Sequence, residues 1–253
     1  YTGFEKKEYY YSFIIGSFYW KDTKLRLAGK IRGEVMISAK ATENLTGITL
    51  EGDYDDLHEI VKSIYRMTGL EEDYEDDYWS VKNRLLGVCY DIRHAFMGDR
   101  EVKLVDNGVH EEIMKWHSMI LPRQEVHFSV NILFPEAVFV ALSVSEIYAQ
   151  SRQYYGKRSK KQQENAEFPS EKYSYYVRDK AILDTLSAVI LGALAEVIGD
   201  EELEKLFKTK SHLYGVGFLN YAAQYVDKCN IEYLKTEPEK RKDKLRNIAK
   251  RLI

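Results

Sequence analysis

Residues 125–134 carry an apolar side chain at every second position, which is the pattern of a β-strand that buries one face. Pro135 follows at once, and proline is tolerated at the first position of a helix. Such a strand needs neighbouring strands and a layer of helices over its apolar face, so it requires a sheet with one covered side. The apolar face carries Val126, Phe128, Val130, Ile132 and Phe134, and the other face carries His127, Ser129, Asn131 and Leu133.

Three shorter strands are predicted before this one. Met36–Thr42 and Ile48–Gly52 alternate as a hairpin around a turn at 43–47, and Glu101–Val105 precedes the turn signal Asp106-Asn107-Gly108. Helical spacing of apolar residues separates these strands, and beyond residue 171 only helical patterns occur. The sequence therefore predicts an α+β fold, with a small, mainly antiparallel sheet of about four strands packed with helices and then an all-helical C-terminal part.

Four regions follow from these patterns. Residues 1–35 are an N-terminal extension rich in aromatic residues, 36–155 an α+β domain, 156–170 a polar linker or loop, and 171–253 a helical C-terminal region. Because Arg32–Met36 can be encoded by a purine-rich stretch ahead of a start codon, one hypothesis is that residues 1–35 are not part of the native protein. The competing interpretation is an aromatic segment that packs on the body or on a partner.

The composition indicates in which compartment the protein acts and which classes of partner it does not attract. A net charge of −3 gives no global field that attracts nucleic acid or an anionic membrane. Two isolated cysteines, Cys89 and Cys229, indicate a reducing compartment rather than a disulfide framework. The longest apolar stretches, near Tyr9–Trp20 and Ala188–Leu194, are shorter than the roughly 20 residues of a membrane span. We therefore expect a cytoplasmic protein that does not bind a membrane.

Sequence motifs for cofactors are absent. The chain has no phosphate-binding glycine loop and no dinucleotide fingerprint, and the acidic run at 71–77 lacks the glycine of a calcium loop. Two cysteines are too few for a zinc site without several histidines. The sequence therefore predicts neither a cofactor nor a metal.

The segment Gly87–Glu101 holds the polar residues most suggestive of chemistry. A helix predicted at about Ser80–Met97 carries an apolar stripe, and at roughly 100° per residue His94 lies nearly opposite that stripe. Asp91 lies one turn before His94, and Tyr90 lies four residues before it, within contact distance. A carboxylate beside an imidazole orients the ring and raises its basicity, as a general base requires. We therefore take Asp91, His94 and Tyr90 as candidate catalytic residues, the alternative being a polar outer helix face.

Three further patterns are weaker. Arg93 and Arg100, near this pair, are candidate anion-binding residues. Ser129 shares a strand face with His127, but it lies inside a strand rather than on the sharp turn of a hydrolase nucleophile, so an open polar sheet face is expected. The C-terminal helix Glu237–Leu252 is basic and can contact phosphates, although acidic residues dilute its charge.

Several segments also resemble a family of uncharacterised bacterial proteins. The resemblance covers about residues 36–149 and implies a bacterial cytosolic origin, but no activity and no site residues. The segments that carry it are Gly52-Asp53-Tyr54-Asp55-Asp56-Leu57, Gly87–Glu101, Val105-Asp106-Asn107-Gly108 and Asn131-Ile132-Leu133-Phe134-Pro135-Glu136.

The leading hypothesis is a non-enzymatic binding or interaction protein, because the sequence shows neither a complete catalytic set nor a cofactor loop. The first alternative is a hydrolase or metal-dependent enzyme that uses Asp91 and His94. The second is nucleic-acid binding through the basic C-terminal helix, which the mixed charges disfavour. The expected partner is another protein or a second copy of the chain.

Overall fold

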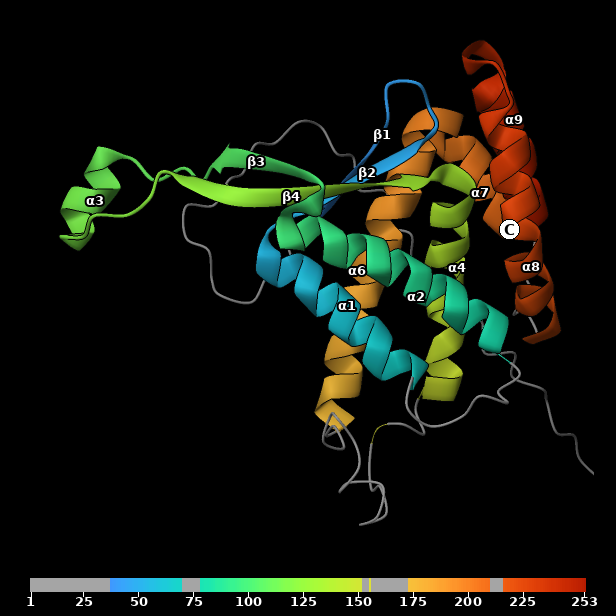
Figure 1. The fold of residues 1–253 in the computed structure, drawn as a ribbon, viewed down its shortest axis with the longest axis horizontal. Helices are drawn as coiled ribbons and strands as arrows, with labels where there is room; N and C mark the ends of the chain where they lie inside the picture. The colour runs from blue at the N-terminus through green and yellow to red at the C-terminus, as the bar shows by residue number, and fades with distance from the viewer. Residues whose placement is uncertain (1–36, 70–77, 152–154, 156–172, 210–215) are drawn as a thin grey trace, which may run out of the picture.

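A computed structural model describes residues 37–69, 78–151, 155, 173–209 and 216–253. The hypotheses on residues 1–35, the acidic run at 71–77 and the linker at 156–170 lie outside these residues. The described part contains four strands and eight α-helices, and Figure 1 shows their arrangement. The elements are β1 (Ser38–Ala41), β2 (Gly47–Gly52), α1 (Tyr54–Thr68), α2 (Trp79–His94), β3 (Glu101–Asp106), α3 (Glu111–His117), β4 (Gln124–Leu133), α4 (Phe134–Ser151), α6 (Tyr173–Ile198), α7 (Asp200–Thr209), α8 (Val216–Leu234) and α9 (Arg241–Leu252), with a π turn at Ala95–Asp99 and a 3-10 turn at Pro238–Lys240.

The four strands form one antiparallel sheet in the order β1-β2-β4-β3. The predicted hairpin of β1 and β2 is confirmed, and β4, the strand with the clearest alternation, lies between β2 and β3. Four helices, α6 to α9, follow the sheet without a further strand in the described residues. The chain is therefore an α+β protein with an all-helical C-terminal part, as the sequence predicts.

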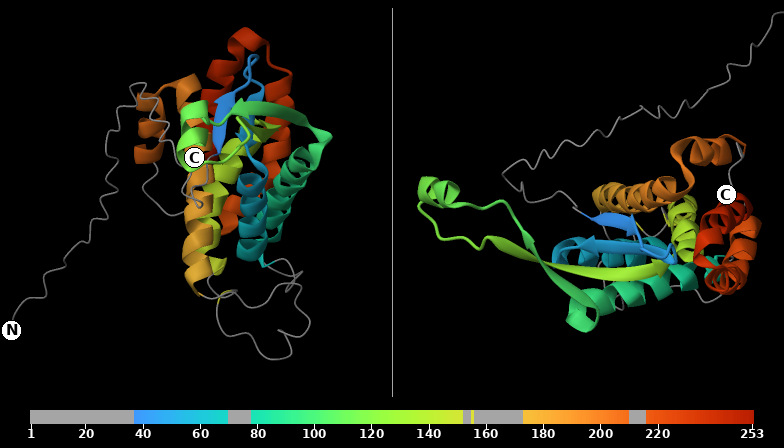
Figure 2. Two further views of the ribbon diagram at one scale, coloured as in Figure 1. Left: turned by 90° about the vertical axis from the view of Figure 1, so that its left-hand side faces the viewer. Right: turned by 90° about the horizontal axis from the view of Figure 1, so that it is seen from above.

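One face of the sheet is apolar and covered. The register places Ile48 opposite Ile132 and Leu50 opposite Val130, and all four side chains are buried. Helices α1, α2 and α4 contact β2 or β4 on this face, whereas α6 packs along β1. Helix α6 also packs on α1 and α4, so it belongs to the same group of helices, next to the edge strand β1; Figure 2 shows the molecule from two further sides. The side chains of β4 thus alternate because one face of the sheet packs on helices and the other faces solvent.

The ends of α1 and α2 follow from local chemistry. The Asp53 side chain accepts a hydrogen bond from the backbone N–H of Asp56 at 2.8 Å, and Gly69 ends α1 in the left-handed conformation. The predicted apolar stripe of α2 is buried. This helix ends at His94, three residues before the predicted end, because a π turn follows and Gly98 turns the chain at φ 89°.

The C-terminal helices share the hydrophobic core of the sheet region. Helix α4 packs on α6, α8 and α9, and one cluster of buried residues includes side chains of both regions. The β1–β2 turn is also held by these helices, since Tyr233 donates its hydroxyl hydrogen to the carbonyl of Leu45. Arg241 donates to the carbonyl of Asn44 at 2.5 Å. The two regions therefore stabilise each other through direct contacts.

Helix α6 is the one described helix that is long and apolar enough to cross a membrane. It is longer than the stretch Ala188–Leu194, from which no span was expected. Half of its most apolar 18-residue window is buried inside the structure, and a core helix of a soluble protein has the same length and composition.

Candidate functional site

The outer part of the β3–β4 hairpin projects from the body and carries α3 at its end (Figure 1). We call residues 102–126 the hairpin arm. Local hydrogen bonds build its turn, since Asp106 accepts from the N–H of Gly108 at 2.7 Å and Asn107 accepts from the N–H of Val109 at 3.1 Å. Nδ1 of His110 then accepts from the N–H of Ile113 and begins α3.

The apolar face of the sheet continues onto the arm without its helical cover. Val102 pairs with Phe128 and Leu104 pairs with Val126, on the same face as the buried pairs nearer the body. Phe128 is partly buried, but the other three side chains are exposed, Leu104 by 65%. A surface made by continuing an apolar core face into solvent is typical of a binding site.

The tip of the arm adds larger apolar side chains to this surface. Trp116 is 87% exposed and Ile120 is 98% exposed, and Met119 is also exposed. None of the residues of α3 is buried, so the body does not use this helix to cover its core. Leaving such side chains in water costs on the order of 1.5–3 kcal/mol for each one that a partner would bury.

Sequence reasoning missed the arm, although a signal for it exists. The predicted strands Glu101–Val105 and Glu125–Phe134 are separated by a segment far longer than the two to five residues of most hairpin loops. Their pairing places this whole connection, 107–123, outside the sheet. Its largest apolar residues lie in a short helix and an irregular segment that the body does not cover.

The structure brings Tyr90 and His94 together, with ring centroids 4.2 Å apart. However, the carboxylate that contacts His94 is that of Asp99, whose Oδ2 lies 2.7 Å from Nδ1. The π turn and Gly98 fold Asp99 back toward the end of α2. His94 is 31% exposed on the side away from the apolar stripe, so its predicted orientation is confirmed.

The other candidate residues of this segment form surface pairs. Asp91 accepts a hydrogen bond from Arg100 at 3.1 Å, and both side chains are about half exposed. Arg93 donates to the hydroxyl of Tyr65 at 3.3 Å, and this hydrogen bond raises the pKa of the Arg93 guanidinium. Within the described residues, no group of three or more histidine, cysteine or acidic side chains is placed to hold a metal ion.

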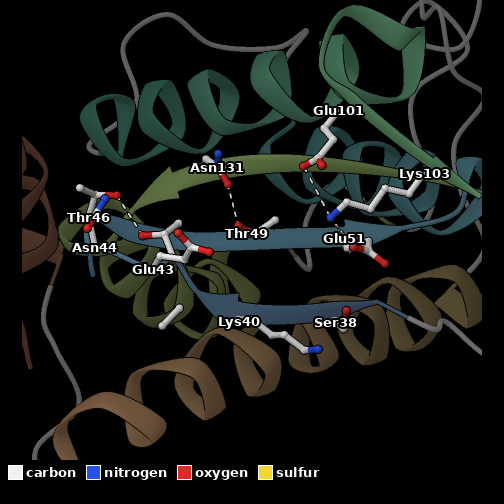
Figure 3. Close-up of a pocket in the computed structure, with 12 residues that line it drawn as sticks. Ser38, Lys40, Glu43, Asn44, Thr46, Thr49, Glu51, Glu101, Lys103 and Asn131 are labelled. Atoms are coloured by element: carbon white, nitrogen blue, oxygen red, sulfur yellow. Dashed lines mark hydrogen bonds and ion pairs between the residues drawn. The ribbon is translucent and has the colours of Figure 1, made fainter. Parts of the chain in front are cut away.

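The second face of the sheet is polar and forms a shallow cavity of about 570 Å³ (Figure 3). Nζ of Lys103 lies 3.4 Å from Glu51 and 3.5 Å from Glu101, so its charge is neutralised by two carboxylates. Thr49 donates to Asn131 at 2.7 Å across the neighbouring strands. These contacts are typical of the solvent-facing side of an antiparallel sheet.

His127 and Ser129 lie on this polar face, as the alternation predicts, but they have different partners. Nδ1 of His127 is 3.3 Å from Glu51, whereas the Ser129 hydroxyl donates to Glu101 at 3.2 Å. The two side chains therefore do not form the hydrogen bond that a nucleophile and its base require.

Several cations of the basic C-terminal helix are paired with acidic side chains of neighbouring helices. Lys244 and Arg251 pair with Glu232 of α8 at 2.9 and 3.4 Å. Lys250 pairs with Glu202 of α7 at 3.4 Å. Arg241 is buried and donates to backbone carbonyls. Cations engaged in this way are less available for phosphates than a free basic stripe.

The comparison with known families covers the described fold from its first strand to its last helix. The family model for a domain of unknown function, DUF6904, matches residues 37–253. The chain belongs to the DUF6904 family. The match includes both the sheet region and the C-terminal helices, so the DUF6904 unit is longer than the segment 36–149 that carried the resemblance. No curated protein and no solved structure matches the chain.

Proposed function

We propose that this DUF6904 protein is a non-enzymatic interaction protein that binds a protein partner through the hairpin arm. The observation that carries the proposal is the exposure of Leu104, Trp116 and Ile120 on a hairpin that the body leaves uncovered. Tryptophan is enriched among the residues that dominate binding energies at protein interfaces. A mainly apolar surface with charged residues around it suits a protein partner better than a small polar ligand.

The two alternative functions, catalysis and nucleic-acid binding, are less well supported by the surfaces that they require. Catalysis by Asp91 and His94 needs the two groups to act together, but each is held by a different partner in an exposed position. Phosphate binding by α9 has to compete with carboxylates of α7 and α8. The arm, in contrast, has apolar groups that gain free energy only when a partner covers them.

We further propose that the protein acts in the bacterial cytosol. Support comes from Cys89 and Cys229, which are free and buried, as expected where no disulfide framework is needed. The resemblance of the segments around Gly87–Glu101 to uncharacterised bacterial proteins points in the same direction.

A photo-crosslinking amino acid at position 116 tests the arm in the organism that encodes the protein. We expect a discrete covalent adduct from this position and none from position 221, where Tyr221 is exposed on α8, away from the arm. The adduct partner should bind the purified chain and lose binding when Trp116→Ser and Ile120→Ser are combined. Equal, diffuse labelling from both positions would show that the arm is not an interaction surface.

A further inference from the structure

We propose that β3 is a docking edge, at which an extended segment of the partner protein adds a strand to the sheet. This inference rests on the proposed function, because it states how the partner of the hairpin arm binds. The segment has apolar side chains at every second position, polar ones between them and a basic one next to Glu101. An extended backbone is the ligand that matches the hydrogen-bonding groups of an open strand edge.

The two edges of the sheet differ in how they are covered. The order β1-β2-β4-β3 leaves β1 and β3 with one neighbouring strand each. Helix α6 packs along β1, whereas the main contacts of β3 are with β4 and with the π turn that leads into it. An uncovered edge strand presents a row of N–H and C=O groups to solvent. The edge open to another strand is therefore β3.

The register shows which backbone groups of β3 face outward. In an antiparallel pair, every second residue directs both its N–H and its C=O to the neighbouring strand. The N–H of Asn107 donates to the carbonyl of Arg123 at 3.1 Å, and these two residues are the next pair in the register of β3 and β4. Counting back by twos, the odd-numbered residues of β3 bond to β4. The even-numbered residues Val102 and Leu104 therefore direct their backbone groups away from the sheet.

The other side of β4 gives the same assignment. The N–H of Phe134 donates to the carbonyl of Thr46 at 3.3 Å, next to the register of β2 and β4. The even-numbered residues of β4 therefore bond to β2, which leaves its odd-numbered residues for β3. In the part of the chain that the structure describes, the outward backbone groups of Val102 and Leu104 have no hydrogen-bond partner.

The side chains along the edge define the chemistry of the segment. Val102 is 49% exposed and Leu104 is 65% exposed on the apolar face, so apolar side chains suit the positions opposite them. On the polar face, Lys103 lies between Glu51 and Glu101 at 3.4 and 3.5 Å and is held over the sheet. The two carboxylates exceed this one positive charge, and the side chain of Glu101 is 61% exposed. A basic residue next to Glu101 therefore complements the edge.

A synthetic peptide, Lys-Val-Thr-Val-Thr-Val-Lys, tests the docking of a strand on the full-length chain. With its valines opposite Val102 and Leu104, the valine N–H groups face β3 and the threonine N–H groups face away. Methylating two valine nitrogens should weaken binding by at least about tenfold in fluorescence anisotropy, because two hydrogen bonds are lost. The matched control, with both threonine nitrogens methylated, has the same composition and charge and should bind as the parent peptide does.

Hydrogen exchange followed by nuclear magnetic resonance tests the edge residue by residue. In the free chain, the amides of Val102 and Leu104 should exchange faster than those of Lys103 and Val105, which bond to β4. Saturation with the peptide should slow the exchange of Val102 and Leu104 by at least about tenfold.

A substitution extends the test to the partner in cells. Proline is tolerated on an edge strand where the N–H faces solvent, so Leu104→Pro removes an outward donor but no bond to β4. It should abolish peptide binding and the adduct from position 116, with the circular dichroism spectrum unchanged. If this variant does not fold, the methylated peptides decide the question without any substitution.

Several results would overturn the docking edge. They are no binding of the parent peptide, equal binding of the two methylated peptides, and unchanged exchange at Val102 and Leu104. A dimeric mass in light scattering, with these amides protected before peptide is added, would mean that a second copy occupies the edge instead. If the edge fails but position 116 gives a discrete adduct, the arm remains an interaction surface. If position 116 gives none either, both proposals are wrong.

Discussion

At the scale of single residues, His58 couples protonation to folding. Its ring lies against Tyr54 and Phe96, with centroid distances of 5.3 and 5.7 Å. Burial, and then the positive charge of Lys62, lower the pKa of His58 below its usual 6.5, although Glu59 and Asp55 act in the opposite direction. The folded protein therefore favours the neutral imidazole.

This shift predicts a loss of stability in mild acid. The contribution of neutral His58 to the free energy of unfolding is fully present above pH 6.5, the pKa of the unfolded state. It is lost as the pH falls through the lower pKa of the folded state, because the unfolded chain binds the proton more readily. Urea unfolding between about pH 7.5 and pH 5 should show a smaller decline for His58→Gln than for the unsubstituted chain. His117→Gln, on the exposed α3, is the control, and an equal effect of both variants would contradict the assignment.

A buried carboxylate links the C-terminal helices to the first helix. Asp179 of α6 is fully buried and accepts hydrogen bonds from Ser63 at 3.1 Å, Arg66 at 2.6 Å and Tyr155 at 2.7 Å. Burial lowers the pKa of Arg66, but the hydrogen bond and charge of Asp179 more than compensate, so the pKa is raised overall. The Arg66 guanidinium therefore stays protonated beside this carboxylate.

Removing the carboxylate should leave the partly buried Arg66 without its counter-charge. We expect Asp179→Ala to lower the free energy of unfolding by about 3–5 kcal/mol, the cost of breaking a buried ion pair from one side. The control Asp243→Ala removes a pair with Arg246 in which Asp243 is 78% exposed, and should cost less than about 1 kcal/mol. Similar urea midpoints for the two variants would show that the buried network adds little stability.

At the scale of secondary-structure elements, two glycines distinguish a close strand contact from an open helix face. A Cβ at Gly47 of β2 would lie 2.0 Å from the carbonyl oxygen of Ile132 on β4, and the obstacle is backbone. A Cβ at Gly87 of α2 would meet no atom within 4 Å. The same substitution should therefore have opposite effects at the two positions.

We expect Gly47→Ala to destabilise the sheet by more than about 2 kcal/mol, because β2 and β4 must separate to admit the methyl group. Gly87→Ala should instead stabilise the protein by about 0.5–1 kcal/mol, since alanine loses less conformational entropy than glycine in a helix. Thermal melts of both variants measure the difference. A loss of stability on Gly87→Ala would mean that this helix face contacts something in solution.

At the scale of the whole molecule, the body and the arm have separate physical roles. The sheet, α1, α2 and the later helices share one core, whereas no residue of α3 contributes a buried side chain. Asp106 and Gln124 pair directly in the register of β3 and β4, so a two-residue turn can replace everything between them.

We predict that replacing residues 107–123 by Asn-Gly leaves the body folded. At low protein concentration, the free energy of unfolding should change by less than about 1 kcal/mol, because the removed residues bury no core surface. The shortened chain should no longer bind the partner that cross-links from position 116 of the full chain. Unfolding of the shortened chain would show instead that the connection stabilises the body.

The sequence alone determined the features that depend on neighbouring residues. Apolar residues at every second position marked β4 and its buried face. The ends of α1 at Asp53 and Gly69 also depend on local chemistry, because capping is satisfied within a few residues. Helical geometry also determined that His94 points away from the apolar stripe. The helical part after residue 171 followed from its spacing of apolar residues.

Only the tertiary structure decided which groups meet and which remain uncovered. Asp99 rather than Asp91 contacts His94, because a π turn changes the direction of the chain after α2. Lys244 and Lys250 of α9 are paired because α8 and α7 bring Glu232 and Glu202 next to them. The arm is exposed because the helices that cover the apolar sheet face end before Leu104. A local sequence pattern shows which face of a strand or helix is apolar. Whether another element covers that face depends on contacts between residues that are distant in sequence.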